Sequence, residues 1–315
     1  MKKALLYSII ACFFLFSCKK EKNAPAKNTL SLKKYSVNFS ISDFTQLTGG
    51  SVKTVNDLKT DAISSSVSVL YYYVYDSSGN YVHTLSQLST NSNFGTIQDS
   101  LATGTYTVAI AAGQTGLSTG AAAESDVLSN AFLTYDTYVG ENGTNPYANQ
   151  PWKDTFLKKF SLTVGTGNIN QTVALDRIVG KIEVQLQDTI PPNAYSIQLT
   201  YTNEYSIYSI SSEQAISSPT LALQYPLVVG TVIPVAAKGT INYTLSNIIG
   251  NTAAPIDVTI KCFDASKNVI AQATVPGVNC QKDVITVLSG KLFIVNNSFQ
   301  VSVNPTWDTP IIITY

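Results

Sequence analysis

The chain has 315 residues, with 20 Lys and Arg against 20 Asp and Glu and a single histidine. Charged residues make up 13% of the sequence, about half the share of a typical soluble domain, so we expect no basic surface for nucleic acid. The 18 tyrosines and the many Val, Ile and Thr residues favour strands, and the length allows two domains of ordinary size.

The chain opens on an export signal. Two lysines precede an apolar run that ends at Phe16 and is shorter than the roughly 20 residues that span a bilayer as a helix. Ser17 and Cys18 follow, and this ending resembles a lipobox, in which cleavage before the cysteine is followed by its acylation. The alternative is an ordinary signal peptide in which Cys18 is incidental. We expect a lipoprotein signal peptide over residues 1–17 and a flexible tether over 18–34.

Alternation of apolar and polar residues predicts strands after the tether. Turn residues at Asp76–Asn80 separate two alternating runs, which predicts a hairpin. The strands predicted for an N-terminal domain, residues 35–175, are Tyr35–Ile41, Val67–Tyr75, Tyr81–Leu85, Thr105–Ile110, Phe156–Val164 and Asn170–Leu175.

Residues 113–152 interrupt this alternation with several glycines and two prolines. A segment of this length is either a functional insertion or an ordered surface excursion. Trp152 lies in it, with Tyr135, Tyr138 and Tyr147 nearby in sequence. Aromatic side chains on a loop can stack on glycans, so Trp152 is a candidate glycan contact. The alternative is that these rings pack the loop onto its own sandwich.

Short strands separated by turn residues continue through a C-terminal domain, residues 176–315. Few helical patterns lie between them, which predicts an all-β fold made of two antiparallel β-sandwiches. The strands predicted here are Ile182–Leu186, Ser196–Tyr201, Ile241–Leu245, Ile256–Phe263, Val269–Val275, Val284–Leu288, Lys291–Val295 and Phe299–Val303.

Two cysteines, Cys262 and Cys280, lie in this second domain. In an oxidising compartment they can form a disulfide, and the alternative is two buried thiols that pack as small apolar side chains. Two cysteines without a nearby histidine make a poor metal site. His83 is the only histidine, and no phosphate loop or nucleophile elbow is present. We therefore predict no enzyme, no metal and no cofactor.

Four segments in order resemble the fimbrillin superfamily of the Bacteroidetes, the subunits and accessory proteins of type V pili. They are Val69–Asp76, Leu101–Val108, Leu175–Val184 and Val287–Phe293. The resemblance implies two tandem transthyretin-like β-sandwiches and a structural role in a fimbria. It implies fimbrial subunits as partners, joined by β-strand addition. With the lipid on Cys18, it also implies a surface-exposed position on the cell outer membrane.

The C-terminal end suits strand addition. Phe299, Val301 and Val303 alternate with polar residues, and Ile311 and Ile313 belong to a final apolar run. An unpaired strand of this kind readily pairs with another chain. The alternative is that it pairs within its own domain.

Arg177 is the only arginine in the sequence. The resemblance implies that stalk subunits lose their lipid and first strand to an Arg-specific protease. Because no arginine lies between Cys18 and Asp176, we expect this chain to keep both, as an outer-membrane anchor or accessory subunit does. The alternative is a Lys-directed cut at Lys33 and Lys34. The alternative function is a cell-surface glycan-binding lipoprotein, or a tip adhesin that combines both roles.

Overall fold

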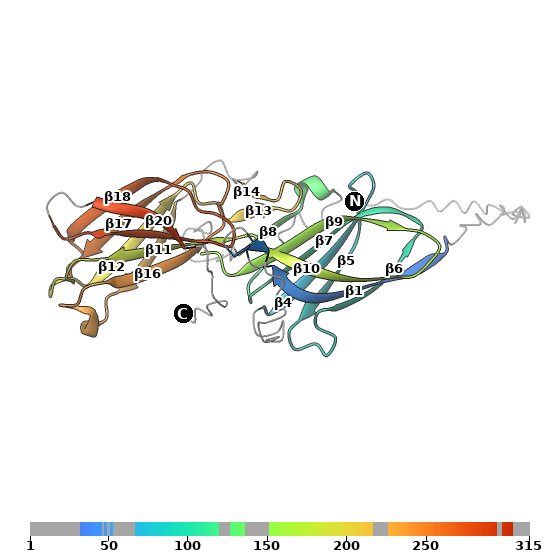
Figure 1. The fold of residues 1–315 in the computed structure, drawn as a ribbon, viewed down its shortest axis with the longest axis horizontal. Helices are drawn as coiled ribbons and strands as arrows, with labels where there is room; N and C mark the ends of the chain where they lie inside the picture. The colour runs from blue at the N-terminus through green and yellow to red at the C-terminus, as the bar shows by residue number, and fades with distance from the viewer. Residues whose placement is uncertain are drawn as a thin grey trace, which may run out of the picture. The chain divides into compact units, whose positions relative to one another are not determined.

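The computed structural model describes residues 32–45, 47–48, 51–52, 67–119, 127–135, 151–216, 226–294 and 298–304. Within these ranges the predicted all-β fold is confirmed, and the helical content is two short 3-10 turns, η1 (Leu128–Asn130) and η2 (Val235–Ala237). Figure 1 shows the strands in two groups that follow one another along the chain.

The first group forms one seven-stranded sheet in the order β5-β4-β7-β9-β10-β1-β6. Neighbouring strands are antiparallel except for β1 and β10, which are parallel. The strands are β1 (Lys34–Thr45), β4 (Val69–Asp76), β5 (Tyr81–Leu88), β6 (Thr96–Ala102), β7 (Gly104–Gly113), β9 (Thr155–Val164) and β10 (Ile169–Arg177). The predicted hairpin is confirmed as β4 and β5.

This sheet curls over its own core. The rings of Phe39 in β1 and Tyr72 in β4 are 5.8 Å apart, although three strands separate β1 from β4 in the sheet. In β4, Tyr72 and its alternate neighbours face this first core, while Tyr73 and Tyr75 face a second apolar cluster. Burial on both faces explains why β4 is a nearly continuous apolar run.

Side chains close the curled sheet between its two edge strands, β5 and β6. The hydroxyl of Tyr72 donates to Asp99 Oδ2 at 2.9 Å, and His83 Nε2 lies 3.0 Å from the same oxygen. Gln87 Nε2 donates to the Thr96 carbonyl at 2.7 Å. We call this set of contacts the β5–β6 seam. It joins two edges that would otherwise be open to other strands.

The second group forms two four-stranded sheets in the orders β16-β11-β19-β20 and β15-β12-β17-β18. Their apolar faces enclose one core, to which both sheets contribute, so this half is a β-sandwich. The strands are β11 (Gly180–Leu186), β12 (Ser196–Thr202), β15 (Leu227–Val232), β16 (Tyr243–Ile249), β17 (Ile256–Phe263), β18 (Val269–Val278), β19 (Ile285–Lys291) and β20 (Ser298–Asn304).

The two halves share one topology. The run β5-β4-β7-β9 corresponds to β15-β12-β17-β18, and β6-β1-β10 corresponds to β16-β11-β19. The expectation of purely antiparallel sheets is wrong for β1 with β10 and for β11 with β19, which are parallel. These pairs are far apart in the chain, so no tight hairpin forces them to be antiparallel. Among the described strands of the two main groups, an eighth strand, β20, is found in the second half alone.

Two small sheets complete the fold. β2 (Leu47–Thr48) pairs with β3 (Ser51–Val52), and β8 (Phe132–Thr134) joins β13 (Ile207–Ser209) and β14 (Gln214–Ile216). β8 belongs to the irregular segment 113–152, and β13 belongs to the second half. The described part of that segment therefore joins the two halves. The predicted domain boundary stays a prediction, and β10 continues past it to Arg177.

Candidate functional site

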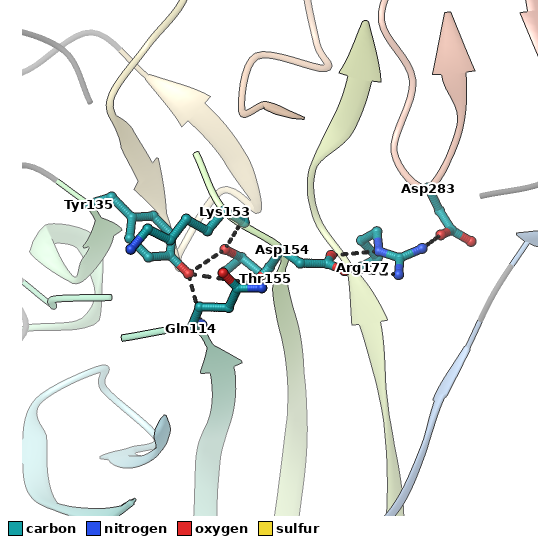
Figure 2. Close-up of polar contacts among 7 residues, drawn as sticks. All are labelled: Gln114, Tyr135, Lys153, Asp154, Thr155, Arg177 and Asp283. Carbon is teal, nitrogen blue, oxygen red and sulfur yellow. Dashed lines mark hydrogen bonds and ion pairs between the residues drawn. The ribbon is translucent and has the colours of Figure 1, made fainter. Parts of the chain in front are cut away.

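Arg177 is buried at the end of β10 (Figure 2). Its Nε and Nη2 donate to the two carboxylate oxygens of Asp154 at 2.7 and 3.1 Å, and its Nη1 donates to Asp283 Oδ1. The guanidinium carbon lies 5.1 Å from the centroid of the Phe156 ring. Three charged groups are thus removed from water together, a state that is stable only while each keeps its partner.

This ion-pair cluster joins the two halves. Asp154 precedes β9 in the first half, and Asp283 precedes β19 in the second. Asp283 holds a left-handed backbone with a φ of 58°, and its N–H donates to the Val179 carbonyl at 2.9 Å. Burial raises the pKa of the Asp154 carboxyl, while the Arg177 guanidinium pulls it down. The connection between β10 and β11 is therefore fixed by both ion pairs and backbone bonds.

A tyrosine hydroxyl holds the start of the irregular segment beside this cluster (Figure 2). The hydroxyl of Tyr135 accepts from the Gln114 N–H at 3.1 Å and from Thr155 Oγ1 at 3.2 Å. Lys153 Nζ donates to the Thr115 carbonyl at 2.7 Å. Burial raises the pKa of Tyr135, so it stays a neutral hydroxyl. These contacts fasten the segment to β7 and β9.

The candidate glycan contact at Trp152 is wrong. The residue is 2% exposed, its indole N–H donates to the Tyr205 carbonyl at 2.8 Å, and its ring meets Tyr135 and Tyr208 edge to face. Gly250 lies so close to the indole that a Cβ there has no room. A ring enclosed in this way has no face left for a sugar. The alternative of packing is right in kind, but much of the packing is on Tyr205, Tyr208 and Gly250 of the second half and not only on the loop's own sandwich.

Glu204 lies next to this indole, fully buried. Its two carboxylate oxygens accept from the N–H groups of Gly250 and Asn251 at 2.6 and 3.1 Å. Burial raises its pKa to about 8, against the opposing effect of these backbone donors. Glu204 therefore holds in place the turn between β16 and β17, in which Gly250 packs against Trp152.

The expected disulfide is not formed, because Cys262 and Cys280 are both free, buried thiols. Cys262 lies in β17 of one sheet, while Cys280 packs over Gly180 in β11 of the opposite sheet. Burial raises their pKa values to about 11 and about 12. They act as small apolar members of the second core, as the alternative proposed.

The first strand of the fold is held on both sides. β1 pairs with β6 from Lys34 to Ser40 and with β10 from Val37 to Thr45. Val37 and Phe39 are fully buried. Removing β1 would break two ladders and open the first core.

The last described strand is held on one side only. β20 pairs with β19 over its whole length and has no second neighbour in its sheet. Phe299 packs on the second core, while Val301 and Val303 are 51% and 53% exposed. The prediction that Phe299, Val301 and Val303 form one strand is confirmed, and here that strand pairs within its own half. Ile311, Ile313 and Cys18 lie outside the described residues, so their roles stay predictions.

Two classes of site are not seen in the ranges that the structure describes. No group of three His, Cys, Asp or Glu side chains there is arranged to hold a metal ion. Those ranges also contain no helix with the length and apolar character needed to cross a membrane.

Comparison with known proteins places the chain in a family. Residues 125–315 match the model of DUF6562, a family of unknown function. The chain belongs to this family. No curated protein matches this DUF6562 chain in sequence.

Solved structures share the fold of this DUF6562 protein at low identity. A candidate adhesin from Bacteroides ovatus is 8% identical with a TM-score of 0.51, covering 84% of this chain and 88% of that one. A candidate adhesin from Bacteroides thetaiotaomicron is 12% identical with a TM-score of 0.50, covering 88% and 98%. The fimbrial anchor protein Mfa2 from Porphyromonas gingivalis is 10% identical with a TM-score of 0.50, covering 89% and 100%. The resemblance to fimbrillin-like proteins is confirmed at the level of the fold.

Two residues of the ion-pair cluster escaped the sequence reasoning. Asp154 and Asp283 are unremarkable in sequence, and they meet Arg177 across separations of 23 and 106 residues. The available signal was Arg177 itself. A lone arginine followed by Ile178 and Val179 predicts a buried cation, which needs an acidic partner.

Proposed function

We propose that this protein is a structural or adhesive subunit of a fimbria, held at the outer membrane by an acylated Cys18. Its most specific role is that of an anchor or accessory subunit, joined to other subunits by β-strand addition. It acts outside the cell, binds fimbrial subunits and carries out no catalysis.

The shared fold of the fimbrial anchor protein Mfa2 supports the fimbrial part of this proposal, because the match spans nearly all of both chains. Low charge and long β-strands with alternating residues are also suited to a protein that works through strand pairing. The adhesin names of the other two neighbours agree with a surface role.

The observation that supports the anchor role is the burial of the sole arginine together with the central position of β1. The sole arginine, Arg177, is 3% exposed and paired with two aspartates, so an Arg-specific protease cannot reach it in the folded chain. β1 itself lies between β6 and β10. A subunit that keeps its first strand, and whose tether is not cut, also keeps the lipid and stays on the membrane.

Mass spectrometry of the cell-surface form tests the membrane part. We expect an N-terminus at Cys18 that carries acyl chains. An unlipidated N-terminus between residues 35 and 60 would contradict it. Purification from the native cell envelope tests the partner, and we expect a fimbrial subunit to co-purify. Retention of lipid without any such subunit would leave a surface lipoprotein of another kind.

The glycan-binding alternative loses the residue on which it rested, since Trp152 is enclosed by Tyr135, Tyr208 and Gly250. A glycan array run with the wild-type chain and with Trp152→Ala separates the two ideas. We expect no signal that depends on Trp152.

A further inference from the structure

The two halves differ at one position of their common topology. In the second half β20 lies beside β19 and pairs with all of it, from Ile285 to Lys291. The corresponding strand of the first half is β10, and its neighbour on that side is β9. The β9–β10 ladder covers only Asp176 and Arg177. Among the described residues, the place that β20 fills in one half is therefore largely without a strand in the other.

The open part of β10 runs from Ile169 to Ala174. On the side away from β1, these residues have no ladder partner among the residues that the structure describes. Asn170, Gln171 and Thr172 are exposed. Every second residue of a strand directs its N–H and C=O to the same side, so this stretch offers a row of backbone donors and acceptors.

The chemistry of this edge suits a strand. Residues 169–174 contain no charge and no proline, the two features that natural edge strands commonly use to block pairing. Phe160 and Ile169 border the opening and are partly buried against the first core. In the second half, the corresponding apolar contact is made by Phe299 of β20, whose ring lies over Gly290 of β19.

The facing stretch of β9, Lys158–Val164, likewise lacks a ladder on this side, but its two charged residues, Lys158 and Lys159, disfavour pairing with a further strand. The remaining places for strand addition in the described part of the first half are less accessible. β1 lies between two ladders, and β5 and β6 are joined by the β5–β6 seam. In a subunit that keeps β1, the space between β6 and β10 is filled by β1 and cannot accept a strand from another subunit. If it accepts a strand in its first half, the edge of β10 is where the described residues leave room.

We propose that residues 169–174 of β10 are an acceptor edge for a strand supplied by another fimbrial subunit, running antiparallel to β10 as β20 runs to β19. The donor is uncharged and extended, with apolar residues at alternate positions that cover Phe160 and Ile169. This inference rests on the proposed function for the identity of the donor, and on the repeated topology for its position.

Disulfide trapping with a synthetic peptide tests the edge. The probe has the sequence of residues 298–304, with a cysteine in place of either Gln300 or Ser302. The mature chain carries Asn170→Cys or Thr172→Cys. The matched control is Thr96→Cys, which is exposed on the edge strand β6. The unmodified chain is the blank, because Cys262 and Cys280 are buried.

We expect at least tenfold more trapping on β10 than on β6. Antiparallel addition also requires that moving the peptide cysteine from 302 to 300 shifts the preferred protein position from 170 to 172. Equal trapping at all three positions, or none on β10, overturns the proposal.

The same cysteine variants in the native envelope separate this inference from the proposed function. A fimbrial subunit that co-purifies and cross-links through β10 supports both. A subunit that co-purifies but never cross-links through positions 170 or 172 overturns the acceptor edge alone. Peptide trapping on β10 without any co-purifying subunit supports the edge and overturns the fimbrial role.

Discussion

The first and last described strands of this protein, β1 and β20, have opposite surroundings. β1 has a neighbour on each side, and Val37 and Phe39 are 0% exposed. β20 has one neighbour, and Val301 and Val303 are about half exposed. An alternating strand is therefore not by itself an exchangeable strand. Its number of ladders and its contact with a core decide whether it can leave, and by that measure β20 can leave and β1 cannot.

Deleting each strand is the strongest test of this difference. We expect deletion of residues 34–45 to abolish cooperative folding. Val37, Phe39 and Ile41 each contribute about 1.5–3 kcal/mol by burial, out of a typical total stability of about 5–15 kcal/mol. Deletion of residues 298–304 should leave a folded protein with a lower melting temperature. Circular dichroism during thermal unfolding measures both, and a folded chain without β1 would contradict the comparison.

Arg177→Ala should lower the free energy of unfolding by about 3–5 kcal/mol, because it leaves Asp154 and Asp283 buried without their cation. Arg177 lies at the end of β10, the strand with which β1 pairs. The matched control is Lys158→Ala, whose ion pair with Asp176 is about half exposed and is worth less than about 1 kcal/mol. Urea unfolding measures both variants. A similar decrease in the free energy of unfolding for both variants would show that the buried ion pairs stabilise the fold no more than an exposed pair does.

Glu204 predicts a pH dependence in the second half. Its folded pKa of about 8 lies above its ordinary value of 4.5, so between these values the folded chain keeps a proton that the unfolded chain has lost. The contribution of Glu204 to the free energy of unfolding is then largest below pH 4.5 and falls towards pH 8, by at most ~1.4 kcal/mol per pH unit.

Glu204→Gln should remove this decline when urea unfolding is measured across that pH range. Glu213→Gln, with a side chain that is 48% exposed, is the control and should leave the slope unchanged. An identical slope in wild type and Glu204→Gln would show that Glu204 stays ionised, held by its backbone donors.

The β5–β6 seam gives a smaller effect. Tyr72→Phe removes one hydrogen bond to Asp99 and keeps the buried ring, so we expect a loss of about 1 kcal/mol. Hydrogen exchange should rise in β6 in particular, because the seam joins β6 to β5. Tyr195→Phe, at an exposed tyrosine, is the control and should change neither quantity.

Val301→Ala tests the smallest effect. Because the side chain is 51% exposed, the free energy of unfolding should change by less than about 0.5 kcal/mol. The same substitution in the β20 peptide should weaken its trapping on β10 if the donor strand buries this residue against Phe160. A large loss of stability in the intact chain would mean that Val301, like Phe299, packs on the second core.

Local patterns predicted much of the strand content. Alternation located Tyr35–Ile41 within β1 and Phe299–Val303 within β20, and the turn at Asp76–Asn80 marked the β4–β5 hairpin, where Asp76 Oδ1 accepts from the N–H groups of Ser78 and Asn80. These signals succeed because side-chain period and turn chemistry act over a few residues.

Contacts between distant parts of the chain escaped prediction. Trp152 had the sequence context of an exposed aromatic loop, yet Gly250 and Tyr205 from the second half enclose it. Cys262 and Cys280 lie close enough in sequence to suggest a disulfide, yet Cys262 is in β17 while Cys280 follows β18 and packs over Gly180 of the opposite sheet, and both thiols are free. In each case the deciding neighbour is far away in sequence.

The sequence by itself determined the all-β class, most of the long strands and the single arginine, since these depend on composition and on period. The tertiary structure decided that Arg177 is buried between two aspartates and that β1 is central. It also decided that, among the described residues, most of β10 lacks a ladder on the side where β19 has β20. Strand order brings residues together that the chain keeps apart, and an edge exists only relative to the neighbours that a strand has or lacks.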